Sequence, residues 1–277
     1  MRATFLQIDG GLTRVLHEGD GPPLILVHGL GTSAERWAQN IDTLARSYSV
    51  YAIDLFNSGF SADIRFTEKP PQKAHIEQLQ EFCNALGIKK ASLAGSSYGG
   101  LVVSLLALER PDLVDKLVIV GSGSALHPPD EQKKSLQAAR ENGLRALKAG
   151  GLAALRKRME NIVSDPASVP ENTLLSLLTA NALPGRDQAL VDLYDGIIGS
   201  CGVADAQVYH RLESISQPTL IVTGRDDIRA KWELAQEAAR RIPRCELHIY
   251  EKCGHAPMQE HPERFNGDLL RFLGGQG

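Results

Sequence analysis

The sequence predicts an α/β fold, in which a mostly parallel twisted sheet is covered by helices on both faces, with an antiparallel N-terminal hairpin and an inserted helical cap. Three observations predict it. Short apolar runs alternate with helical patterns along most of the chain, a hairpin pattern stands at the N-terminus, and residues 124–207 lack any convincing strand pattern. A chain of 277 residues can bury the core of one such domain.

The hairpin is predicted from the runs 5–8 and 12–17, which flank Asp9-Gly10-Gly11, a sequence that favours a tight turn. Six further runs are short, apolar and bounded by turn residues, and they are expected as strands: 24–28, 50–53, 91–95, 117–121, 219–223 and 246–250. Helical patterns lie between them, as in Ile76, Leu79 and Phe82, which precede Gly87. Repeated strand–helix units imply a parallel sheet.

The segment 124–207 contains apolar residues at helical spacing, broken at Pro128-Pro129, Gly150-Gly151 and Pro184-Gly185. We therefore expect a helical cap over the carboxyl edge of the sheet. The expected organisation is a core made of residues 1–123 and 208–277, with the cap at 124–207.

Composition argues against several classes of protein. A formal net charge of −3 and a pI near 6.3 give no electrostatic basis for binding nucleic acid or an anionic membrane surface. The four cysteines form no CxxC pair, which indicates reduced thiols. The N-terminus lacks the apolar run of a signal peptide, and no run approaches the roughly 20 residues of a membrane span. These features predict a soluble cytoplasmic protein.

The candidate nucleophile is Ser97, in the sequence Gly95-Ser96-Ser97-Tyr98-Gly99. The expected strand 91–95 precedes this G-x-S-x-G motif, and the apolar helical run 100–108 follows it. This order is typical of a nucleophile elbow, a strained turn that presents the serine hydroxyl to a pocket. The flanking glycines let the helix pack closely on the strand.

A serine nucleophile needs a base, and the base needs an orienting acid. Two aspartates, Asp226 and Asp227, follow the expected strand 219–223, and His255 follows the strand 246–250. Both loops leave the carboxyl edge of the predicted sheet, and the chain order Ser, Asp, His is that of one known triad arrangement. The strand 117–121 is followed by no carboxylate.

These motifs resemble those of the α/β-hydrolase superfamily. The resemblance is carried by five segments outside the expected cap: 28–31 (His-Gly-Leu-Gly), 54–61, 95–99, 224–227 and 254–255. It implies that Asp227 rather than Asp226 is the acid, and that His255 is the base. It also implies an oxyanion hole formed by the backbone N–H groups of Leu30 and Tyr98, with His28 bracing the oxyanion loop.

The same resemblance implies catalysis without a cofactor, on a small-molecule carbonyl substrate. No spacing of histidines and acids points to a metal site. The candidates for substrate contact are Gly29, Tyr98 and Arg186, the last as a carboxylate-binding arginine on the cap. The sequence leaves a homodimer open.

The reaction is less clearly indicated than the residues. The cap and the loop 251–255 resemble hydrolases that cleave carbon–carbon bonds in ring-fission (meta-cleavage) products. Those enzymes commonly have asparagine where this chain has Ser96, and tryptophan where it has Ala256. We therefore favour a carboxylic-ester or lactone hydrolase that works through an acyl-enzyme, with carbon–carbon hydrolysis as the alternative. Perhydrolase activity also stays open.

A third interpretation belongs to another class of protein. Hormone receptors on this scaffold keep an intact triad with little turnover, so the chain is alternatively a small-molecule receptor. Sustained turnover would favour the enzyme over the receptor.

Overall fold

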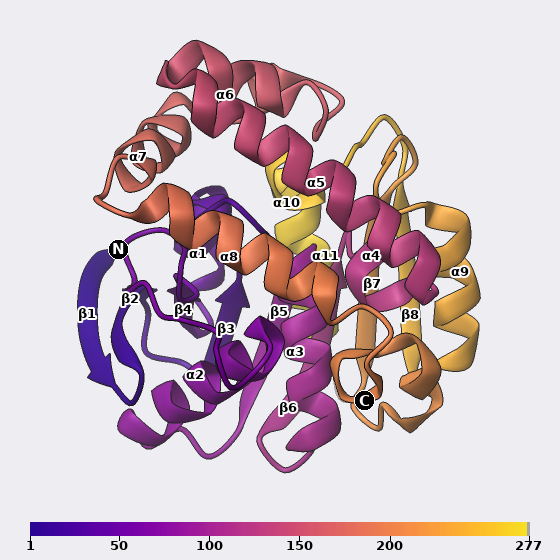
Figure 1. Ribbon diagram of the computed structural model, residues 1–277. Coiled ribbons are helices and arrows are strands. Elements are labelled where there is room, and N and C mark those ends of the chain that lie inside the picture. Colours follow the sequence, from indigo (N-terminus) through magenta and orange to yellow (C-terminus); the bar gives the residue numbers. More distant parts are fainter. Residues whose placement is uncertain (276–277) are drawn as a thin grey trace.

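A computed structural model describes residues 1–275 as one eight-stranded sheet with helices on both faces (Figure 1). The strand order is β1-β2-β4-β3-β5-β6-β7-β8. Strand β2 pairs antiparallel with β1 and β4, and all the other pairs are parallel. The strands are β1 (Arg2–Ile8), β2 (Gly11–Glu18), β3 (Pro23–Val27), β4 (Ser49–Ile53), β5 (Ala91–Ser96), β6 (Val114–Val120), β7 (Thr219–Gly224) and β8 (Cys245–Tyr250).

The eight predicted strands are all present, and each differs from its expected bounds by only a few residues. The hairpin turns at Gly10, whose φ of 87° suits a residue without a side chain. Buried strands β3, β5, β6 and β7 read as nearly continuous apolar runs because both of their faces are covered.

Alternate residues of the central strands enter two separate cores. Ile25, Leu93 and Ile119 face the side covered by α2 (Pro71–Ala85), α3 (Tyr98–Glu109) and α9 (Trp232–Arg241). Leu26, Ala94 and Val120 face the side covered by α1 (Ala38–Leu44) and α11 (Pro262–Gly274). Two short helices near the strand ends complete this core: η1 (Ala34–Trp37) and α10 (Pro257–Glu260).

Between β6 and β7 the chain forms helices and 3-10 turns without a strand. We refer to residues 124–207 of this region as the helical insertion; it is coloured magenta to orange and gathers at one side of the molecule in Figure 1. Its helices, with the flanking η4, are α4 (Gly123–Leu126), α5 (Pro129–Ala149), α6 (Gly151–Met159), η2 (Pro166–Ser168), α7 (Glu171–Asn181), α8 (Arg186–Gly199), η3 (Ala204–Ala206) and η4 (Tyr209–Ser214). Among residues 1–275, every helix is too short or too polar to cross a bilayer.

Candidate active site

Ser97 occupies the turn between β5 and α3. Its φ of 54° and ψ of −120° lie in a region that residues with a side chain rarely adopt. The turn is held by its own backbone, because Ser97 N–H donates to Val120 O at 2.8 Å and Gly100 N–H donates to Ser97 O at 2.9 Å. The hydroxyl of Ser124 adds a further bond to Ser97 O at 3.0 Å. This is the strained strand–turn–helix geometry that the motif predicts.

The glycines beside the serine are required by close backbone contacts. A Cβ on Gly95 would overlap the backbone of Gly99, and a Cβ on Gly99 would overlap the carbonyl groups of Val27 and His28. Gly29 lies against the nucleophile itself, since a Cβ there would stand 2.9 Å from Ser97 Cβ. Gly29 also lines the pocket that contains Ser97, and the substrate contact expected there stays a prediction.

Asp227 and His255 come together at the ends of β7 and β8, as the sequence predicts. His255 Nδ1 lies 2.8 Å from Asp227 Oδ2, and both side chains are buried. The other carboxylate oxygen, Oδ1, accepts the N–H groups of Arg229 and Ala230 at 2.8 and 3.0 Å. An ionised carboxylate accepts only, so Nδ1 carries the proton and Nε2 stays free as a base. Asp226 is exposed.

Ser97 and His255 line one pocket of about 30 Å³, which we call the serine pocket. Within residues 1–275, Ser97 Oγ makes no hydrogen bond, to His255 or to any other group. A nucleophile–base hydrogen bond often forms fully only when substrate is present. The three candidate residues thus meet at one place, with the acid–base pair already joined.

The expected oxyanion donors belong to the two loops that flank Ser97. Leu30 lines the serine pocket after β3, and Tyr98 opens helix α3. His28 braces the first loop: Nδ1 donates to Gly29 O at 2.7 Å and Nε2 accepts Leu55 N–H at 3.0 Å. Burial lowers the pKa of His28, which fits this neutral form. The bracing role implied by the resemblance matches these bonds.

The Tyr98 side chain points away from the serine pocket, although substrate contact is predicted for it. Its hydroxyl lies 2.8 Å from Nδ1 of His75, and Nε2 of His75 donates to Phe56 O at 3.1 Å. Burial lowers the pKa of His75 to about 3, so the ring is neutral and Nδ1 accepts a hydrogen bond from the Tyr98 hydroxyl. The tyrosine side chain therefore anchors the elbow to α2.

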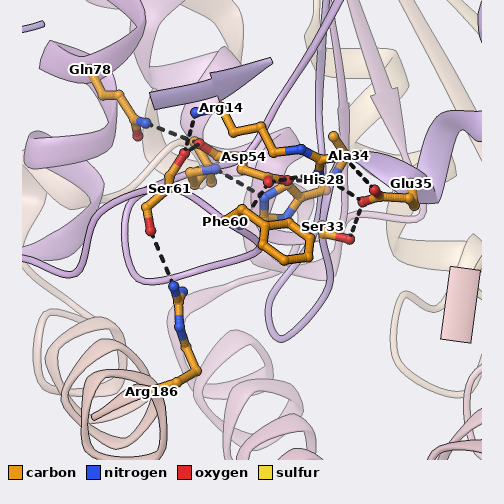
Figure 2. Close-up of polar contacts among 11 residues, drawn as sticks. Arg14, His28, Ser33, Ala34, Glu35, Asp54, Phe60, Ser61, Gln78 and Arg186 are labelled. Carbon is orange, nitrogen blue, oxygen red and sulfur yellow. Dashed lines mark hydrogen bonds and ion pairs between the residues drawn. The ribbon is translucent and has the colours of Figure 1, made fainter. Parts of the chain in front are cut away.

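A buried polar network holds the loop after β3 (Figure 2). Asp54 accepts Ala34 N–H at 2.6 Å and pairs with Arg14 at 3.0 Å. Arg14 also pairs with Glu35 at 2.6 Å, and Ser33 donates to the same carboxylate. This network fixes η1 and therefore the direction in which its other side chains point.

The helical insertion contacts the loop after β3 and the loop that carries His255. Arg158 of α6 donates to Gly31 O at 2.5 Å and to Leu30 O at 3.2 Å. Four residues later, Ile162 O accepts the backbone N–H of His255 at 2.8 Å. One short stretch of the insertion thus fixes the oxyanion loop and the histidine loop together.

Arg186, predicted to bind substrate, lies outside the serine pocket. Its guanidinium donates to Ser61 O at 3.1 Å (Figure 2) and also pairs with Asp63 at 3.2 Å. The substrate-binding prediction for Arg186 is not supported by this geometry, because the residue ties α8 to the loop after β4. Sequence position on a cap did not reveal which way the side chain points.

Three other arginines line the serine pocket, and the sequence analysis missed them: Arg36, Arg158 and Arg229. The one available signal was proximity, since Arg36 follows the His-Gly motif and Arg229 follows Asp227. Within residues 1–275, no three histidine, cysteine or acidic side chains are grouped so as to hold a metal ion.

The strand–serine–helix turn, with acid and histidine loops at the same sheet edge, defines the α/β-hydrolase class of proteins. A family model described as alpha/beta hydrolase fold matches residues 22–262. The chain belongs to this family, and the relatives described below are named as a hydrolase and an esterase.

Two curated relatives show which hydrolases are similar. A 2-hydroxy-6-oxononadienedioate/2-hydroxy-6-oxononatrienedioate hydrolase of Pseudomonas sp. is 30% identical over 96% of this chain and 93% of its own. A pimeloyl-[acyl-carrier protein] methyl ester esterase of Vibrio atlanticus is 28% identical over 92% of this chain and 95% of its own.

A solved structure supports the fold. The crystal structure of a meta-cleavage product hydrolase mutant superposes with a TM-score of 0.82 at 22% identity, covering 98% of this chain and 97% of that one.

Proposed function

We propose that the protein hydrolyses a carbon–carbon bond next to a ketone in an unsaturated acyclic acid, with Ser97 as nucleophile, His255 as base and Asp227 as orienting acid. The observation that carries this proposal is the 30% identity, over 96% of the chain, to a hydrolase whose name specifies a 6-oxo dienedioate. The sequence alone favours an ester or lactone hydrolase; the relatives support the carbon–carbon alternative more strongly.

In the proposed reaction, His255 takes the Ser97 proton while Oγ attacks the ketone carbon. The N–H groups of Leu30 and Tyr98 stabilise the oxyanion, each contributing about 2.7–4 kcal/mol to the transition state. When the carbon–carbon bond breaks, its electron pair leaves with the unsaturated fragment, and His255 returns the proton to that fragment. Water, activated by His255, then hydrolyses the acyl-enzyme.

Ester hydrolysis is the second candidate, and specific observations favour it. The esterase from Vibrio atlanticus covers 92% of this chain. In addition, Ser96 and Ala256 stand where ring-fission hydrolases commonly have asparagine and tryptophan. Both positions are buried, and the Ser96 hydroxyl makes no hydrogen bond within residues 1–275.

The two candidates are separated by comparing kcat/KM on a ring-fission dienone acid and on p-nitrophenyl butyrate. We expect sustained turnover with a preference for the dienone, and Ser97→Ala should lower kcat by about 10⁴-fold or more. Ser104→Ala is the matched control, because Ser104 is a buried serine of α3 outside the pocket. Preference for the ester would select the second candidate, whereas one turnover with retained ligand would indicate a receptor.

A further inference from the structure

We propose that Arg36, Arg158 and Arg229 form an anion site inside the serine pocket, and that the site binds a carboxylate of the substrate beside the reacting carbonyl. We call these three residues the arginine site. The inference rests on the proposed function in one respect only, because it places the carboxylate on the molecule that Ser97 attacks.

The first argument is that these cations are buried without an acidic partner. Arg36 and Arg158 are each 5% exposed, and Arg229 is half-buried. Within residues 1–275, none of the three forms an ion pair, and the guanidinium groups of Arg36 and Arg229 donate no hydrogen bond. Buried charges are normally paired, so a site of this kind calls for a ligand of opposite charge.

The second argument is that the neighbouring carboxylates are already committed. Burial opposes ionisation of Glu35, but its bonds to Arg14 and Ser33 hold its pKa at about 2. Glu260 accepts three backbone N–H groups, from Ser164, Gly254 and Ala256. Asp227 accepts hydrogen bonds from His255 and from the backbone of its own loop. Glu260 and Asp227 are close enough to act on the pKa of Arg36, but among the described residues no carboxylate forms an ion pair with the arginine site.

The third argument is mutual repulsion. Burial and the charge of Arg158 together lower the pKa of Arg36 to about 10, although Glu260 and Asp227 act to raise it. The pKa of Arg229 falls to about 10 for the same two reasons. The three guanidinium groups therefore lie close enough to disfavour one another, an arrangement that costs stability until an anion neutralises it.

The position of the site fits substrate recognition. All three arginines line the pocket that contains Ser97 and His255. Arg229 and Ser135 also line an adjoining cavity of about 350 Å³, which we call the outer cavity. That cavity also bears Lys134, Arg145 and Lys231 against Glu131 and Glu141, so its lining carries more positive than negative side chains.

Arginine is suited to a carboxylate because its planar fork donates two parallel hydrogen bonds to the two oxygens. The chemical class of ligand is accordingly an acyclic carboxylic acid whose carbonyl group reaches Ser97. The site differs from the one expected at Arg186, which is engaged by Ser61 and Asp63.

The test measures binding to the Ser97→Ala protein, so it does not depend on which bond is cleaved. Glutarate and its neutral analogue glutaramide are titrated by calorimetry at low and at 0.3 M salt. We expect glutarate to bind, more weakly at high salt, and glutaramide to bind at least about tenfold less tightly. Arg36→Gln and Arg229→Gln should each weaken glutarate binding at least about tenfold. Arg36→Lys, which keeps the charge, should weaken glutarate binding less than Arg36→Gln does.

The controls separate recognition from folding. Arg241→Gln removes an arginine of α9 outside the pocket and should leave glutarate binding unchanged. Arg36→Gln should leave the Tm unchanged or raise it, because it removes an unpaired buried charge. A lowered Tm with unchanged glutarate affinity would overturn the proposal, as would equal binding of glutaramide or loss of binding in Arg186→Gln alone. If glutarate binds as expected while the wild-type protein leaves the dienone intact, the proposed function fails and the arginine site stands.

Discussion

The pairing of Asp227 with His255 decides the tautomer of the imidazole. One oxygen of Asp227 faces Nδ1 and the other is held by two backbone N–H groups, so the carboxylate has one orientation. This leaves Nε2 unprotonated toward the serine pocket. Asparagine would present an N–H to either the histidine or the loop, and it would disfavour the required tautomer.

We therefore expect Asp227→Asn to lower kcat by about 10⁴-fold, the order seen for the corresponding change in serine proteases, with little change in fold. The measurement is steady-state kinetics on the best substrate, with circular dichroism as a check on folding. Asp226→Asn is the matched control, since Asp226 is the exposed neighbour on the same loop. If the Asp226 variant lost activity and the Asp227 variant kept it, the assignment of the acid would be wrong.

Sequence motifs predicted Ser97, Asp227 and His255 because backbone topology places them at the sheet edge, whatever their side chains touch. The directions of Arg36 and Arg186 could not be predicted in this way. Whether Arg36 enters a pocket depends on Asp54 and Arg14, which fix η1 from strands far away in the chain. The orientation of Arg186 depends likewise on a tertiary contact with Asp63. Such directions are set by packing, so spacing alone does not reveal them.

At the level of elements, the junction of β5 and α3 determines how Ser97, the proposed nucleophile, is presented. The two elements meet so closely that the backbone of Gly99 occupies the place where a side chain of Gly95 would lie. The strain at Ser97 is maintained by this packing and by the hydrogen bonds to the neighbouring strand β6.

Gly95→Ala should therefore destabilise the protein severely, because its new Cβ meets backbone atoms that cannot move aside independently. We expect a loss of soluble protein or a Tm lowered by more than 10 °C, since about 1 kcal/mol corresponds to about 2–4 °C in a domain of this size. The measurement is a thermal melt followed by circular dichroism.

Gly267→Ala is the contrasting variant. Gly267 lies on the exposed side of α11, and a Cβ there would meet no atom within 4 Å. Alanine should stabilise that helix by about 0.5–1 kcal/mol. A wild-type melting curve for Gly95→Ala would show that the elbow tolerates a side chain and that the packing argument fails.

At the scale of the whole molecule, the sheet and the helical insertion were predicted from periodicity, because strands and helices differ in spacing and the strand runs are short. The contacts of the insertion could not be predicted from periodicity. They depend on tertiary hydrogen bonds such as Arg158 with Leu30 O and Ile162 O with His255 N–H. The outer cavity likewise arises between α5 and the loop after β7, which are distant in sequence.

The molecule also contains three buried histidines whose pKa values burial lowers: His28, His75 to about 3 and His127 to about 4. Their folded pKa lies below the unfolded value of about 6.5, so the unfolded chain binds protons first as pH falls. Stability is thus complete above about pH 6.5 and is lost as pH falls toward the folded pKa values.

We expect the free energy of unfolding to fall between pH 6.5 and 4.5, with His75 contributing about 2–3 kcal/mol over that range. Urea unfolding at pH 7, 6, 5 and 4.5 measures this. His75→Gln should flatten part of the slope, and His210→Gln, at an exposed position, should leave it intact. If the free energy of unfolding of the His75 variant changed with pH as it does in the wild type, His75 would not contribute to the pH dependence.

The small volume of the serine pocket has a consequence for the order of events in turnover. About 30 Å³ beside Ser97 accommodates little more than one or two water molecules, and ligand sites usually measure about 300–1,000 Å³. The pocket beside Ser97 is therefore nearly closed, and a reactant of several carbons fits only if the wall formed by α5, α6 and Arg229 moves outward. Opening of that wall, rather than bond cleavage, would then limit kcat for bulky reactants. Raised solvent viscosity would therefore lower kcat more for bulky reactants than for small ones.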